Sequence, residues 1–266
     1  MEYQTETAHG TLFCRKEGSG PLLLLIHGVA CDSEFFRQTS AILAEKFTVI
    51  SYDRRGYSRS VPAEGEDDFS VWAHAEDAAE LIRRELESQP DQSVCVAGCS
   101  AGGAVAAALA TRYPELVRAV FLHEPLMRGS GELAEEQDAF WEKLRKSAAK
   151  HRIITCMMHF VNAMGGMNRD KEGQTMEQQG RNLKNLEFFL DREMDSFSSL
   201  SLEDFSISTP VTVACGADDT EGMFHRSARQ AAEIKGWNYI TVPGYHNFAS
   251  DEPELFAEAL MGVFFH

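Results

Sequence analysis

The sequence contains no apolar stretch that approaches the roughly 20 residues an α-helix needs to cross a bilayer. Its first residues, Met1 to Glu6, include neither a basic region nor an apolar core, so they do not resemble a secretory signal. These two absences predict a cytoplasmic protein with no membrane partner.

Positive charge is also scarce. Lys and Arg number 25 against 41 Asp and Glu, which gives a formal net charge of −16 at pH 7. Nucleic acid and anionic membranes are themselves negative and repel such a surface. We therefore expect neither as a partner and favour a small molecule as the ligand. The pattern leaves the oligomeric state open.

Cysteine pairs of the C-x-x-C type are absent. The cysteines are scattered, and several fall within predicted strands or beside Ser100. Buried free thiols in a reducing compartment explain this pattern better than disulfides or a zinc site. We expect neither a metal nor a cofactor. The six positions are Cys14, Cys31, Cys95, Cys99, Cys156 and Cys215.

Short apolar runs of strand length alternate with helical patterns over much of the 266-residue chain. Leu22–Ile26 is continuously apolar, as in a strand buried on both faces of a parallel sheet. The alternation predicts an α/β fold with a mostly parallel central sheet flanked by helices, after a β-hairpin over residues 1–17. The other predicted strands are Thr48–Tyr52, Val94–Ala97, Ala119–His123, Val211–Cys215 and Tyr239–Val242.

Residues 128–207 break this alternation, because they have a helical composition rich in Met and Phe without a convincing buried strand. Such a segment is either the core of a helical subdomain or a lid whose adaptable side chains line an apolar pocket. We favour the lid. The predicted organisation is thus one core, residues 1–127 and 208–266, with a helical cap inserted at 128–207.

A serine lies at an abrupt turn in the segment Gly98-Cys99-Ser100-Ala101-Gly102. A valine-rich strand precedes this turn and an alanine-rich helix follows it. A strand can change to a helix this abruptly only if the neighbours of the apical residue lack bulk. The Ser100 hydroxyl would then stand at a helix N-terminus, with the amide of Ala101 facing any oxyanion. The alternative is a Gly/Ser turn without chemistry, but the flanking pattern favours a nucleophile.

A serine hydroxyl needs a base to take its proton and a carboxylate to orient that base. His246 is the best base, because it follows the last strand at the same sheet edge as Ser100. Two acids qualify. Glu124 follows the strand Ala119–His123 directly, and Asp219 lies in the loop after the next strand. Both obey the order Ser, acid, His.

Together these motifs resemble the α/β-hydrolase superfamily over essentially the full length of the chain. One departure is Ser58, at a position where the family usually has glycine. The motifs that carry the resemblance are Leu22–Gly28 as oxyanion strand and turn, Asp53–Ser60 as the D-x-R-G-x-G-x-S loop, Gly98–Gly102 as nucleophile elbow and Pro243–His246 as histidine loop.

The resemblance implies an oxyanion hole made by the backbone amides of Val29 and Ala101. Most members carry the acid where Asp219 stands. A smaller branch, which includes zearalenone lactonases, is similar in its His-Glu dipeptide and its Gly-Cys-Ser elbow, and it uses the equivalent of Glu124. We favour Glu124 and keep Asp219 as the alternative. The likeness to that branch is confined to short motifs and does not carry over its substrate.

The sequence therefore predicts a serine hydrolase that cleaves an ester or lactone of a small, largely apolar molecule through an acyl-enzyme. Carbon–carbon bond hydrolysis and perhydrolysis use the same triad and stay open. A ligand receptor or binding protein on a hydrolase scaffold is the alternative from a different class. The set of nucleophile, base and acid candidates favours the enzyme.

Overall fold

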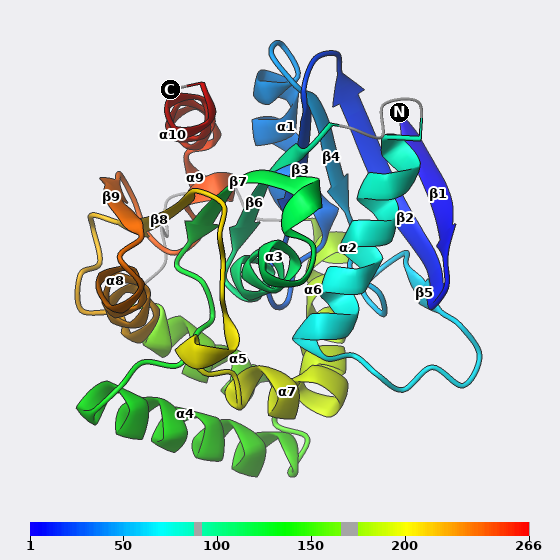
Figure 1. Cartoon of the computed structure of the whole chain (residues 1–266). Helices are drawn as coiled ribbons and strands as arrows, with labels where there is room; N and C mark the ends of the chain where they lie inside the picture. Colours follow the sequence, from blue (N-terminus) through cyan, green and yellow to red (C-terminus); the bar gives the residue numbers. More distant parts are fainter. Residues whose placement is uncertain (88–91, 166–174, 266) are drawn as a thin grey trace.

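The computed structural model of the chain describes residues 1–87, 92–165 and 175–265. A single sheet forms the centre, with strand order β1-β2-β4-β3-β6-β7-β8-β9 and β5 paired to β2 (Figure 1). The strands are β1 (Glu2–Thr7), β2 (Gly10–Gly18), β3 (Leu22–Ile26), β4 (Thr48–Tyr52), β5 (Val61–Pro62), β6 (Val94–Cys99), β7 (Val117–His123), β8 (Val211–Gly216) and β9 (Asn238–Val242).

The strands from β4 and β3 to β9 pair in parallel, which confirms the predicted α/β fold class. The predicted hairpin forms between β1 and β2, but β2 is longer than the apolar pattern indicates. Its second half pairs antiparallel with β4, from Cys14 opposite Tyr52 to Gly18 opposite Thr48. The apolar pattern misses this extension because it consists of the polar residues Arg15, Lys16 and Glu17. Their backbones pair within the sheet while their side chains are partly exposed to solvent.

Two layers of helices cover the sheet (Figure 1). On one face the alternate side chains of β3 and β6 pack against α2, α3 and α8, and on the other face against α1, α9 and α10. Alanine lets α3 lie close to the sheet, since every residue from Ala104 to Ala110 is buried. The bounds are α1 (Arg37–Leu43), α2 (Val71–Glu85), α3 (Ala101–Arg112), α8 (Met223–Lys235), α9 (Phe248–Asp251) and α10 (Pro253–Phe264).

A helical insertion lies between β7 and β8, and α4 crosses the bottom of the molecule in Figure 1. Within it, α6 continues into a short π-helical turn, η3, and then α7. No helix in the described ranges is long and apolar enough to cross a membrane. The insertion comprises α4 (Glu132–Ala148), α5 (Ile153–Ala163), α6 (Met176–Phe188), η3 (Phe189–Glu193) and α7 (Met194–Ser198), and the remaining short turns are η1 (Ser33–Phe36), η2 (Pro114–Leu116) and η4 (Leu202–Asp204).

Candidate active site

Ser100 lies at the junction of β6 and α3 with φ 56° and ψ −123°, a conformation that non-glycine residues rarely adopt. Its neighbours must be small. A Cβ at Gly98 would collide with the backbone of Gly102, and one at Gly102 would collide with the backbone of Ile26. The sequence therefore forms the strained turn that places Ser100 ahead of the first helical residue, Ala101.

The turn after β3 lies against this serine. A Cβ added to Gly28 would be 2.9 Å from the Ser100 Cβ and 3.5 Å from its Oγ. The next residue, Val29, lines the same cavity as Ser100. Of the two amides that the family resemblance implied for an oxyanion hole, that of Ala101 directly follows the serine and that of Val29 belongs to this neighbouring turn.

His246 and Glu124 are in direct contact. The Nδ1 atom of His246 lies 2.6 Å from Oε2 of Glu124, and both residues are buried. The other carboxylate oxygen, Oε1, accepts the backbone N–H of Gly216 at 3.0 Å. Burial opposes ionisation of Glu124, but the imidazoles of His225 and His246 outweigh it and hold the pKa of the carboxyl below its usual range. An ionised carboxylate can only accept a hydrogen bond, so Nδ1 of the neutral His246 ring carries the proton and donates to Glu124. The other ring nitrogen, Nε2, is then unprotonated and can take a proton.

Asp219 lies elsewhere. Its Oδ1 accepts the backbone N–H of Gly222 at 3.0 Å, in the turn that leads into α8. A Cβ at Gly165, two residues after the end of α5, would collide with the Asp219 carboxylate, so this side chain packs between the turn and the insertion. Of the two acids in the sequence, Glu124 is the one whose carboxylate contacts His246.

A second histidine borders the same carboxylate and was not singled out from the sequence. His225, buried near the start of α8, places Nδ1 3.6 Å from Oε1 of Glu124, and the Tyr239 hydroxyl lies 3.4 Å from its Nε2. Donor atoms of Glu124, His225 and Cys215 all lie within 4.8 Å of one another, a grouping that could hold a metal ion. The only sequence signal for His225 was its position as the third residue of a helix that follows a predicted strand, and that signal was weak.

Ser100 and His246 open into one cavity of about 430 Å³. The core contributes the turn from Gly28 to Cys31 and the side chain of Phe35. Most of the remaining wall is apolar and comes from the insertion. Its polar members are Gln179 and Asn182 from α6, and Asn247 and Ser250 from the core. Neither Lys nor Arg is among the described lining residues. The apolar residues from α5 and α6 are Ile154, Met157, Phe160, Val161, Leu183 and Leu186, joined by Met164 at the end of α5.

Ser58, the departure from the family pattern, ties the core to α6. Its φ is 45°, a conformation in which glycine is unstrained. The Ser58 hydroxyl donates to Oδ2 of Asp32 at 2.7 Å, and its backbone N–H donates to Oδ1 of Asn185 at 3.0 Å. Arg181, also on α6, donates to the same Asp32 oxygen at 3.0 Å.

Comparisons with known proteins agree with this architecture. A family model described as alpha/beta hydrolase fold matches residues 21–220. The chain is 28% identical over 252 residues to the uncharacterized hydrolase YraK of Bacillus subtilis (strain 168), a match that covers 91% of this chain and 88% of that protein.

Solved structures show the same fold at lower identity. A bromoperoxidase from Bacillus anthracis superposes with a TM-score of 0.78 at 20% identity, covering 100% of both chains. The enol-lactonase from Burkholderia xenovorans LB400 gives a TM-score of 0.71 at 17% identity, covering 97% of each chain. With the family model matching most of its length, this chain belongs to the alpha/beta hydrolase fold family.

Proposed function

We propose that the protein is a serine hydrolase that cleaves an ester or lactone of a small, largely apolar and uncharged molecule. The observation that carries this proposal is the arrangement of three side chains around one cavity. Ser100 and His246 both line the cavity, and Glu124 holds His246 from behind through Nδ1.

In the first half-reaction, the Ser100 Oγ attacks the carbonyl carbon while Nε2 of His246 takes the hydroxyl proton. The carbonyl oxygen becomes an oxyanion, which the amides of Val29 and Ala101 stabilise. Glu124 stabilises the imidazolium and keeps the ring oriented. The bond from the carbonyl carbon to the leaving oxygen then breaks, and this oxygen takes the proton that His246 received from Ser100.

In the second half-reaction, water attacks the acyl-enzyme and His246 takes its proton. The second tetrahedral intermediate breaks the bond to Oγ, and His246 returns the proton to Ser100. The products are one carboxylic acid and one alcohol, or a single hydroxy acid from a lactone. The enzyme is regenerated without any net gain or loss of protons by its side chains.

The lining of the cavity supports the substrate class. Its volume, about 430 Å³, suits a small molecule rather than a polymer. An anionic substrate would need a cationic partner, and the described lining residues include no Lys or Arg. The fold neighbour named as an enol-lactonase illustrates that a lactone can be opened on this architecture, although its identity to this chain is only 17%.

Labelling with a fluorophosphonate, read by peptide mass spectrometry, tests the activated serine. We expect one adduct, on Ser100, in the wild type and in Asp219→Asn, and a strongly slowed reaction in Glu124→Gln. Turnover of p-nitrophenyl esters over many cycles then separates an enzyme from a receptor, which would complete at most one slow cycle. An unlabelled Ser100, or full ester activity in Ser100→Ala, would overturn the proposal.

A further inference from the structure

A fully buried ion pair joins the insertion to the core near the cavity. Arg54 follows β4, Glu193 ends the π-helical turn η3, and the side chains of both have no exposed surface. The Arg54 Nη1 lies 3.1 Å from each oxygen of the Glu193 carboxylate. The Tyr57 hydroxyl donates to Oε2 at 2.8 Å, and His74 Nε2 donates to Oε1 at 2.6 Å.

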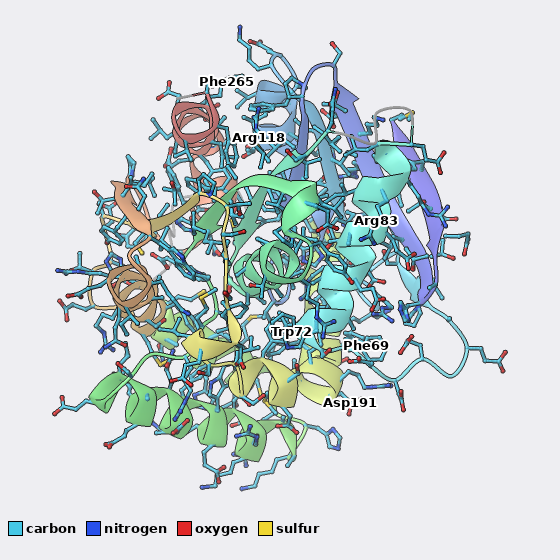
Figure 2. The ribbon with its side chains drawn as sticks, in the orientation of Figure 1. Phe69, Trp72, Arg83, Arg118, Asp191 and Phe265 are labelled. Carbon is cyan, nitrogen blue, oxygen red and sulfur yellow. The ribbon has the colours of Figure 1, made fainter. Side chains whose placement is uncertain are left out.

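These partners keep the Glu193 carboxylate ionised. Burial would raise its pKa, but the charge of Arg54 and the hydrogen bonds from His74 and Tyr57 outweigh burial and lower it to about 2. The loop after β4 that carries Arg54 also packs tightly against the insertion. A Cβ at Gly56 would collide with the ring of Phe188, the last residue of α6. At this contact of insertion and core, the guanidinium of Arg192 in η3 lies 4.7 Å from the ring centroid of Phe69, just before α2. Figure 2 labels Phe69 and Asp191, the residue before Arg192.

Arg54 also reaches the turn that carries Val29. Its Nη2 lies 3.4 Å from the carbonyl oxygen of Gly28, and its backbone N–H donates to Nε2 of His27 at 2.9 Å. A backbone N–H can only donate, so Nε2 is unprotonated and the neutral ring carries its proton on Nδ1. Burial and the charge of Arg54 lower the pKa of His27 to about 4, which keeps the ring neutral at pH 7.

The protonated Nδ1 of His27 lies 2.9 Å from the same Gly28 oxygen. The Gly28 carbonyl therefore has two donors, His27 Nδ1 and the Arg54 guanidinium. That carbonyl and the Val29 N–H are opposite ends of one planar peptide group. Donors at the oxygen fix the plane of the peptide, and they polarise its N–H into a stronger donor.

We propose that Arg54 and Glu193 are positioning residues for the oxyanion hole. Glu193, from the insertion, holds Arg54 against the Gly28 carbonyl, so packing of the insertion on the core orients the Val29 amide. This inference rests on the proposed function, since it assigns a task to a group of the same site. The pair should therefore strengthen the binding of a ligand that places an oxyanion in the hole. It should have no specific effect on the affinity for an uncharged ligand that resembles the ground state.

The variant that tests this must fold, and loss of one partner alone would leave a buried charge unpaired. The double variant Arg54→Met/Glu193→Gln removes both charges, and its glutamine still offers an acceptor to His74 or Tyr57. Arg181→Gln is the matched control, because it breaks another core-to-insertion ion pair, to Asp32, that does not involve Gly28. Thermal unfolding of each variant shows that it is folded.

The readout is the affinity for two ketones with the same short alkyl chain. A trifluoromethyl ketone forms a hemiketal with Ser100 and places an oxyanion in the hole, whereas the methyl ketone binds as the neutral ground state. We expect the double variant to lose about 10- to 100-fold in affinity for the first, less than complete removal of a donor costs. Its affinity for the second should change by less than about threefold, and Arg181→Gln should keep the wild-type ratio.

Equal weakening of both ketones in the double variant, or an unchanged ratio, would overturn the inference while leaving the proposed function intact. A wild type that binds the trifluoromethyl ketone no better than the methyl ketone would overturn the proposed function, and the inference with it. Ser100→Ala must also abolish the preference for the trifluoromethyl ketone, because the hemiketal cannot form without the hydroxyl.

Discussion

The Nδ1 atom of His246 lies 2.6 Å from a carboxylate at the end of β7, that of Glu124, although β8 carries its own acid in the following loop. Glu124 is held across both strand ends, because its backbone N–H donates to Ala214 in β8 and its Oε1 accepts from Gly216. Its φ of 40° is unusual for a glutamate and turns the chain immediately after the strand. The carboxylate is therefore positioned by two strands rather than by a flexible loop.

Paired substitutions of the two acids separate their roles. Glu124→Gln removes the charge that stabilises the His246 imidazolium, so we expect kcat for ester hydrolysis to fall on the order of 10³- to 10⁴-fold. Asp219→Asn keeps an acceptor for the Gly222 N–H, and we expect kcat within about threefold of the wild type. Steady-state hydrolysis of a p-nitrophenyl ester measures both. A larger loss in Asp219→Asn than in Glu124→Gln would reverse the assignment.

The local part of this structure was predictable from sequence, and the long-range part was not. Leu22–Ile26 and the Gly98–Gly102 elbow have distinct signatures because burial on both faces and a strained turn dictate residue type locally. Whether Glu124 or Asp219 faces His246 depends on how the chain bends after two strands, so the residue types alone left both acids open, and only the resemblance in the His-Glu dipeptide and the elbow favoured Glu124. The pairing of Arg54 with Glu193 joins residues 139 positions apart, so it emerges only when the insertion packs on the core.

The close approach of Gly28 to Ser100 makes a sharp prediction about the oxyanion turn. In Gly28→Ala the new Cβ would lie 2.9 Å from the Ser100 Cβ and 3.1 Å from the Cys99 carbonyl oxygen, so the turn or the serine must shift. We expect kcat/KM to fall about 100-fold, because a donor displaced by about 1 Å loses much of its effect. Gly262→Ala in α10 is the control, since a Cβ there meets nothing within 4 Å. Wild-type activity in Gly28→Ala would contradict the role of this turn.

Ser58 combines a strained backbone with useful hydrogen bonds, and two substitutions separate these effects. Ser58→Ala keeps the φ of 45° and loses the hydroxyl that donates to Asp32. Ser58→Gly loses the same hydroxyl but relieves the strain. We expect Ser58→Ala to lower the free energy of unfolding by about 2 kcal/mol, and Ser58→Gly by about 1 kcal/mol less than that. Urea unfolding measures both values. A glycine variant that is less stable than the alanine variant would show that the left-handed backbone carries no strain.

The buried ring of His123 links stability to pH. Burial, the largest influence, lowers its pKa to about 4, against about 6.5 in an unfolded chain. Below pH 6.5 the unfolded state therefore binds a proton that the folded state excludes until about pH 4, so stability decreases as the pH falls through this window. At pH 5 this ring alone should cost about 2 kcal/mol relative to pH 7.

Neither ring nitrogen of His123 has a hydrogen-bond partner in the described part of the chain, and Phe248 and Phe256 lie at 5.9 and 6.1 Å between ring centroids. Phenylalanine can therefore replace the ring without breaking a described hydrogen bond. We expect His123→Phe to show near wild-type stability at pH 7 and a smaller loss between pH 7 and pH 5 in urea unfolding. The loss should shrink without vanishing, because His27 also has a pKa lowered to about 4 by burial and the charge of Arg54. If the two proteins lost the same free energy between these pH values, His123 would have to be protonated in the folded state, against the desolvation that its burial imposes.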